Sequence, residues 1–145
     1  MFIRRAEARD IPSLNEIMFG SSAYAGEYRR ILEGYDLTED YLDRCHVWLA
    51  DSDGGTQGFY SLVLEPEPEL DLLFVADAAQ GCGFGRRLFG HMRELARSLS
   101  VRRVKIVSHP PSEGFYLGQG AVRLGADPPR GRVSWTRPVL ELAVG

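Results

Sequence analysis

The amino-acid sequence predicts an α/β fold, a mixed central sheet of about seven strands with an antiparallel front half and about four helices. Two strand-like runs, 46–50 and 56–64, flank the turn sequence DSDGG at 51–55, which is typical of a β-hairpin. A strongly apolar strand at 70–76 then ends in a glycine-rich loop. Beyond the loop, apolar residues recur at helical spacing and further short strands follow. Antiparallel strands before the loop and strand–helix alternation after it predict a mixed sheet.

The front half begins with a strand at 2–6 and a helix that starts at Asp10. Asp10 is placed to cap this helix, and Pro12 lies in its first turn, where the missing N–H does no harm. The sequence AYAGEYRRILEGY at 23–35 predicts a second helix. Thr38 then caps a short turn before the hairpin begins.

A helix of about four turns follows the glycine loop, because apolar residues spaced by four, three and four positions share one of its faces. These residues are Leu88, Met92, Leu95 and Leu99. A strand at 102–108, a short helix at 112–117 and strands at 121–125 and 135–144 complete the order. Pro138 cannot donate to a strand ladder, so we expect the last strand to be an edge strand or irregular near its start.

Length and composition predict a single domain spanning 1–145. The formal net charge of −3 argues against nucleic acid as a partner. Lys105 is the only lysine and is followed by Ile106, which excludes a phosphate-binding P-loop. The two cysteines and three histidines show no metal-ligand spacing, so no metal site is expected.

No apolar run approaches the ~20 residues that a membrane span requires, so we expect no membrane partner. The N-terminal sequence MFIRRAEARDIP lacks the apolar centre of a signal peptide. These features predict a soluble cytoplasmic protein and leave open whether it is a monomer or a homodimer.

The residues AQGCGFGRR (79–87) place three glycines at alternate positions in front of two arginines. Backbone N–H groups at a helix N-terminus are unpaired and carry the positive end of the helix dipole, and glycines let an anion approach them. Arg86 and Arg87 stand in the first helical turn, where a bound polyanion would offset the unfavourable dipole. The loop predicts a phosphate site, although a tight connection with solvated arginines explains these residues equally well.

The stretch 70–96 resembles the acetyl-CoA-binding segment of the GNAT superfamily of N-acetyltransferases. The family signature, Gln/Arg-x-x-Gly-x-Gly/Ala, is met by Gln80, Gly83 and Gly85. The resemblance implies acetyl-CoA as co-substrate, and its close part covers 69–125.

A second motif follows at the expected separation. The sequence HPPSEGFYLGQG resembles the family pattern Asn-x-x-Ala-x-x-Phe-Tyr-x-x-x-Gly, which Phe115, Tyr116 and Gly120 match. His109 stands where Asn is usual and Ser112 stands where Ala is usual. Two motifs in the right order make the resemblance specific.

The resemblance implies that the cofactor's pyrophosphate lies on the loop amides. These belong to Gln80, Gly81, Cys82, Gly83, Phe84, Gly85 and Arg86, with Arg86 adding charge and Cys82 contributing only its amide. The pantetheine arm would pair with the backbone around Phe74 and Val75 as an added strand, and a bulge there would separate this strand from the next. His109 would hydrogen-bond the cofactor or cap the following turn.

The implied reaction moves an acetyl group from acetyl-CoA to a primary amine of a small molecule or peptide. Tyr116 matches the family's tyrosine general acid, whereas without the motif it reads as a core aromatic residue. Asp71, the only charge in LDLLFV, is the candidate base or water-holder. Strand alternation predicts that Asp71 shares the face of Leu73 and Val75, and a solvent-facing aspartate at a strand start explains it equally well.

The sequence does not identify the amine acceptor. Tyr24, Tyr28 and Tyr35 predict an aromatic-lined cleft or simply a packed helix pair. The acidic turn EPEPE at 65–69 would attract a cation, or is a solvated hairpin. A non-catalytic acyl-CoA-binding module on the same fold is the main alternative, which retention of Tyr116 disfavours. A flavodoxin-like nucleotide binder is disfavoured by the antiparallel hairpin.

Overall fold

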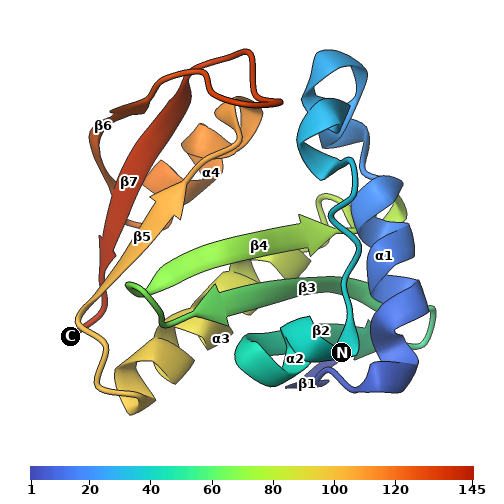
Figure 1. Ribbon diagram of the computed structural model, residues 1–145. Helices are drawn as coiled ribbons and strands as arrows, with labels where there is room; N and C mark the ends of the chain where they lie inside the picture. The colour runs from blue at the N-terminus through green and yellow to red at the C-terminus, as the bar shows by residue number, and fades with distance from the viewer.

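The computed structural model describes residues 1–145, and its centre is a seven-stranded sheet in the order β1-β2-β3-β4-β5-β7-β6 (Figure 1). Neighbouring strands are antiparallel except β4 and β5, which are parallel. The strands are β1 (Phe2–Arg5), β2 (His46–Ser52), β3 (Gly55–Val63), β4 (Glu69–Val75), β5 (Arg103–Val107), β6 (Val122–Asp127) and β7 (Arg137–Ala143). The expected mixed sheet with an antiparallel front half is confirmed.

Four α-helices and five short 3₁₀ segments surround the sheet. The α-helices are α1 (Ile11–Phe19), α2 (Glu39–Arg44), α3 (Phe84–Ser98) and α4 (Glu113–Gly118). The 3₁₀ segments are η1 (Ala8–Asp10), η2 (Ser22–Tyr24), η3 (Gly26–Leu32), η4 (Asp77–Ala79) and η5 (Pro110–Ser112). Figure 1 shows α1 and α2 on one face of the sheet and α3 on the other.

The sheet separates two apolar cores. On the α3 side Leu88, Phe89 and Met92 are fully buried against the sheet. On the α1 side Leu14 and Met18 are fully buried in the same way. Each face of the sheet therefore has its own helical cover, and the two covers fix the orientation of β4, which contributes side chains to both cores.

Two expected elements differ in the structure. The segment 23–35 does not form one continuous helix but 3₁₀ helices, because the extended backbone of Ala25 and the positive φ of Gly26 (70°) interrupt it between η2 and η3. The last strand, β7, is not an edge strand, since it lies between β5 and β6. Pro138 is tolerated there as the second residue of the strand, and its carbonyl accepts a hydrogen bond from the Ser108 amide.

The strands β4 and β5 separate soon after they meet. Glu69 and Lys105 are the one residue pair between them. Beyond this pair the β5-facing edge of β4 has no strand partner, and Figure 1 shows the two strands diverging. An unpartnered strand edge presents N–H and C=O groups that another extended chain can pair with.

A β-bulge in β4 accompanies this separation. Leu70 and Leu72 pair with consecutive residues of β3, which leaves Asp71 as the extra residue. The bulge therefore lies at Asp71, and not around Phe74 and Val75 as the sequence led us to expect. A bulge bends its strand, which is why β4 can leave β5 here.

None of the helices is long and apolar enough to cross a membrane. Nowhere in the structure do three or more histidine, cysteine or carboxylate side chains gather as ligands of a metal ion would. The predicted compartment and oligomeric state stay predictions.

Candidate active site

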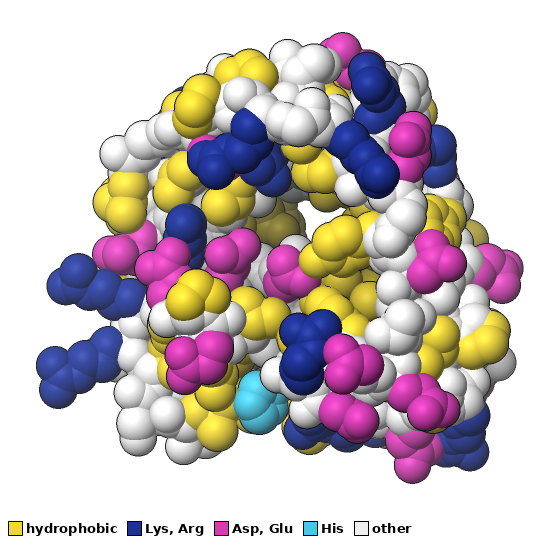
Figure 2. All heavy atoms as spheres, in the orientation of Figure 1, with side chains coloured by type: hydrophobic (Ala, Val, Ile, Leu, Met, Phe, Trp, Pro, Cys, Tyr) yellow, Lys and Arg dark blue, Asp and Glu magenta, His cyan; other side chains and the backbone are white.

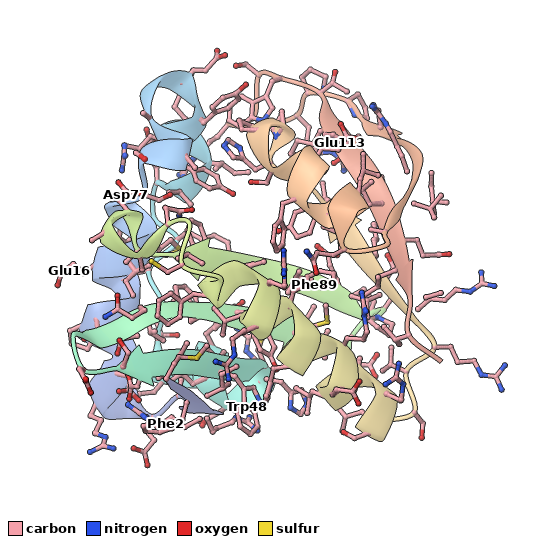
Figure 3. All side chains as sticks on the ribbon, turned by 180° about the vertical axis from the view of Figure 1, so that it is seen from behind. Phe2, Glu16, Trp48, Asp77, Phe89 and Glu113 are labelled. Atoms are coloured by element: carbon pink, nitrogen blue, oxygen red, sulfur yellow. The ribbon has the colours of Figure 1, made fainter.

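A cavity of about 780 Å³ lies where β4 and β5 separate, within the size range of small-molecule sites. Figure 3 shows the molecule from the α3 and α4 side, with Asp77 marking the segment between β4 and the glycine loop and Glu113 marking α4. All the predicted site residues except Cys82 line this cavity, namely Asp71, Phe74, Val75, Gln80, Gly81, Gly83, Phe84, Gly85, Arg86, His109 and Tyr116.

The glycine loop turns the chain from β4 into α3. Gly81 and Gly83 have φ angles of 80° and 84°, in the left-handed region that favours glycine. Gly83 is the N-cap of α3 and supplies no side-chain cap, so the first N–H groups of the helix have no internal acceptor. The Gln80 side chain donates to the Val75 carbonyl at 2.9 Å and fastens the loop to β4. Free amides at a fixed helix start suit an anion.

The remaining loop residues differ in what they contribute. Gly85 has ordinary helical geometry, and a Cβ there would lie 3.6 Å from the Phe115 ring, so alanine fits. Arg86 lines the cavity, is exposed and has no ion-pair partner in the chain. The exposed Cys82 lies outside the cavity lining, and its amide donates to the Ala79 carbonyl at 3.3 Å, so it is not one of the free amides of the loop.

Tyr116 projects from α4 into the core beside the cavity and is 8% exposed. Its ring packs against Phe115 (5.4 Å between centroids) and Phe89 (6.0 Å), and Figure 3 shows Phe89 between α3 and α4. Burial, with a smaller effect of Tyr24, raises the pKa of Tyr116 above its ordinary value. The hydroxyl therefore stays protonated, as an acid requires, while the ring is part of the core.

Asp71 lies on the face of β4 opposite to the one that alternation predicted. The bulge adds one residue to the strand, and the regular two-residue alternation fails at that point. Leu73 and Val75 pack on the α3 side of the sheet. The Asp71 carboxylate instead faces the side of Leu72 and Phe74, where α1 and α2 lie.

Two tyrosines hold the Asp71 carboxylate. Its Oδ2 accepts hydrogen bonds from the hydroxyls of Tyr35 (2.8 Å) and Tyr41. The Tyr41 hydroxyl is also bonded to Ser61 Oγ, 2.8 Å away. Burial and then the charge of Asp71 raise the pKa of both phenols, which keeps them protonated as donors. The other carboxylate oxygen, Oδ1, has no donor in the chain and is free for a ligand.

His109 lies in the cavity wall and contacts the segment 23–28. Its Nε2–H donates to the Ala23 carbonyl, and its ring stacks on Tyr24 (3.9 Å between centroids) and meets Tyr28 edge-on (4.6 Å). It makes no cap for the turn that follows, so that alternative is wrong. Burial lowers the pKa of His109, which makes the ring neutral, and its buried Nδ1 has no partner in the chain. Cofactor contact stays a prediction.

A smaller cavity of about 240 Å³ continues from Asp71 on the α1 side of the sheet. It shares several lining residues with the larger cavity: Tyr24, Asp71, Leu72, Phe74, Val107 and His109. Tyr35 lines it too, whereas Tyr28 lies behind the wall, edge-on to Trp135 at 4.8 Å. The expected aromatic cleft is therefore present, formed by 3₁₀ segments rather than a packed helix pair.

Several residues of this smaller cavity were not recognised as such from the sequence. Glu69 lines it and was visible only as the last residue of the acidic turn. Trp135 and Arg137 come from the far end of the chain, and Tyr41 reaches Asp71 from α2. No local pattern links positions so distant in sequence.

A pair of parallel strands that separates beside a glycine-rich helix start is the geometry expected of an acetyl-CoA-dependent acyltransferase. The family model of the acetyltransferase (GNAT) domain matches residues 27–139. The chain belongs to the GNAT acetyltransferase family, and its members are acyltransferases. A search of curated proteins by sequence found no match.

Solved structures with the same fold cover nearly the whole chain. PaiA N-acetyltransferase from Thermoplasma acidophilum, in complex with coenzyme A, has a TM-score of 0.81 at 18% identity over 98% of both chains. Ribosomal-protein-alanine N-acetyltransferase from Brucella melitensis has a TM-score of 0.74 at 20% identity over 99% of both. N-acetyltransferase from Staphylococcus aureus Mu50 has a TM-score of 0.74 at 16% identity over 99% of this chain and 98% of that chain. At these identities the likeness establishes the fold and leaves the acceptor open.

Proposed function

We propose that this protein transfers the acetyl group of acetyl-CoA to a primary amine of a small molecule or peptide, by direct attack of the amine on the thioester. Residues 1–145 would act as one such domain. The observation that carries the proposal is that free amides of the glycine loop, the unpartnered edge of β4 and the buried Tyr116 meet in one cavity. Along its length, acetyl-CoA needs a site for its pyrophosphate anion, then one for its extended pantetheine arm, and finally a proton donor at its thioester sulfur.

The cofactor's pyrophosphate binds the free amides of the loop, those of Gly81 and of Gly83 to Arg86, and Arg86 adds a positive charge. The pantetheine arm pairs with the free edge of β4 at Phe74 and Val75, as an added strand does. The coenzyme A complex of the similarly folded PaiA protein supports this use of the fold.

An amine arrives as an ammonium, because its pKa is ~10.4, and must lose a proton before it attacks. Asp71 Oδ1 accepts the N–H and either takes that proton or holds the water that does. The nitrogen then bonds to the thioester carbon, and the carbonyl oxygen becomes an oxyanion that unpaired N–H groups of β4 stabilise. When the C–S bond breaks, Tyr116 donates its proton to the sulfur, the nitrogen loses its second proton to solvent, and Tyr116 later regains a proton from solvent.

The loop variant Gly85→Asp tests the cofactor site, with Gly85→Ala as its matched control. The Cβ of alanine has room, so Gly85→Ala should bind coenzyme A with wild-type affinity in calorimetry. The carboxylate of aspartate would stand among the amides and repel the pyrophosphate, so Gly85→Asp should abolish binding. Wild-type affinity in a folded Gly85→Asp protein contradicts the assigned site.

Release of free thiol from acetyl-CoA in the presence of amines tests the enzyme itself. We expect release to rise with some amines and not with others. Tight cofactor binding without amine-dependent release across a broad panel would favour the non-catalytic acyl-CoA-binding module instead.

A further inference from the structure

The smaller cavity has walls of opposite charge. Glu69 and Asp71 stand on its β4 wall, and Arg137 stands on its β7 wall. The remaining lining residues carry no charge, since burial lowers the pKa of His109 and keeps its ring neutral. Figure 2 shows acidic side chains along the lower edge of the central hollow and basic side chains above it, with a further basic side chain below the acidic ones.

The β4 wall offers acceptors that nothing in the chain uses. Asp71 Oδ2 accepts hydrogen bonds from two tyrosines, and Oδ1 has no donor in the chain. Glu69, half-buried, has no hydrogen bond or ion pair, because Lys105 donates to Glu67 instead (3.0 Å). Half-buried carboxylates are unfavourable without a partner, so this wall suits an ammonium group.

The β7 wall offers donors that nothing in the chain uses. One terminal nitrogen of Arg137 donates to Asp127 Oδ2 at 2.8 Å, and the other terminal nitrogen has no acceptor in the chain. The indole N–H of Trp135, which also lines the cavity, is buried with no acceptor. The indole N–H of Trp135 and the Nε–H of Arg137 are closed off from the cavity, so the second terminal nitrogen of Arg137 is the donor that an anionic oxygen in the cavity would reach.

We infer that the acceptor is a small zwitterion, an amino acid whose ammonium group faces Glu69 and Asp71 and whose carboxylate faces Arg137. This inference rests on the proposed function, because it assigns the acceptor of the same site. A diamine would place its second ammonium against Arg137, and an alkylamine would leave the terminal nitrogen of Arg137 that Asp127 does not bind without an acceptor. The cavity of about 240 Å³ equals about eight liquid-water volumes, which limits the acceptor to a small molecule.

Acceptors of matched length test the inference on the wild-type protein. 4-Aminobutanoate, n-butylamine and 1,4-diaminobutane share one carbon chain and differ only at the far end. Glycine and 3-aminopropanoate vary the spacing of the two charges, and a short peptide with a free N-terminus tests a larger acceptor. We expect one free amino acid to exceed n-butylamine, the diamine and the peptide in kcat/KM by about 10–100-fold, the worth of a hydrogen bond to a charged group.

The outcomes separate the two proposals. If n-butylamine, the diamine or the peptide is used as well as every free amino acid, the inference is wrong and the acetyltransferase function stands. If no amine raises thiol release, the proposed function fails and the inference fails with it.

Arg137→Gln and Arg130→Gln form a matched pair of variants. Both arginines bind Asp127, but Arg137 lines the cavity and Arg130 does not. Arg137→Gln should reduce the preference for the amino acid over n-butylamine to about onefold, and Arg130→Gln should keep the preference. A folded Arg137→Gln protein with the wild-type preference overturns the inference. If that variant does not fold, the wild-type acceptor comparison decides alone.

Discussion

Replacing Tyr116 by phenylalanine tests the proposed acid with little disturbance of the fold. The substitution keeps the ring that packs on Phe89 and Phe115 and removes only the hydroxyl. The Tyr116 hydroxyl makes no hydrogen bond within the chain, so its removal leaves no partner unsatisfied. We therefore expect the free energy of unfolding to change by less than about 1 kcal/mol, measured by thermal or denaturant unfolding.

The catalytic effect should be much larger. The leaving thiol has a pKa near ~8.5, so at neutral pH it departs better when it receives a proton. A positioned acid contributes about 10²–10⁴ in rate, which is about 2.7–5.4 kcal/mol in the barrier. The dry surroundings that raise the pKa of Tyr116 also make the departing thiolate a stronger base, so the proton can still move. We expect kcat to fall by this factor and the KM for acetyl-CoA to stay near wild type.

Thiol release at saturating amine measures the defect, and Tyr24→Phe is the matched control. Tyr24 lines the same cavity, and its phenylalanine variant also loses one phenol hydroxyl, but Tyr24 has no proposed role in proton transfer. The Tyr116→Phe defect should shrink with acceptors whose attack, and not thiol departure, limits the rate. If Tyr116→Phe turns over at the wild-type rate with its best acceptor, Tyr116 is core packing and another group or water is the acid.

Three further predictions concern charge. Asp71→Asn should lower kcat/KM for the amine by about 10–100-fold, less at high pH where the amine is already neutral, as a pH profile of thiol release would show. Arg86→Ala should weaken coenzyme A binding in calorimetry at low salt, and the difference should vanish at about 1 M salt, because an exposed charge is screened there. Asp10→Asn should destabilise the fold by about 3 kcal/mol, or about 6–12 °C in Tm. Hydrogen bonds from Arg4 lower the pKa of Asp10, so its contribution is present above the unfolded pKa of ~3.9 and is lost as pH falls through the folded value, where wild type and variant should converge.

The parts of the fold that short-range patterns determine were predictable from the sequence. Gly81 and Gly83 do occupy left-handed backbone positions at a helix start, and Thr38 caps α2 by accepting from the Tyr41 amide. The apolar stripe of α3 is buried at Leu88 and Met92, as its spacing predicted. Such features depend on neighbours within one turn or one loop, so the local sequence carries them.

The face of Asp71 could not be predicted in this way. Alternation assumes that every residue of β4 has a partner in β3, and the extra residue is created only by the pairing of the two strands. The position of Arg137 has the same cause, because β7 pairs with β5 and brings Arg137 to a cavity whose other wall is β4, far away in sequence. Long-range pairing therefore decided the residues of the smaller cavity, while local pattern decided those of the glycine loop.

The shifted position of Asp71 also changes what it can do. In the proposed function the cofactor enters along the glycine loop and the α3 side, where a free carboxylate would repel its phosphates and disfavour a departing thiolate. On the α1 side the same carboxylate stands at the boundary of both cavities, held by Tyr35 and Tyr41 with one oxygen free. If the proposed function holds, a cationic acceptor is attracted there and reaches the thioester through the separation of β4 from β5, from the other side of the sheet. In that mechanism the bulge has two effects, because it bends β4 away from β5 and turns the Asp71 carboxylate toward the amine.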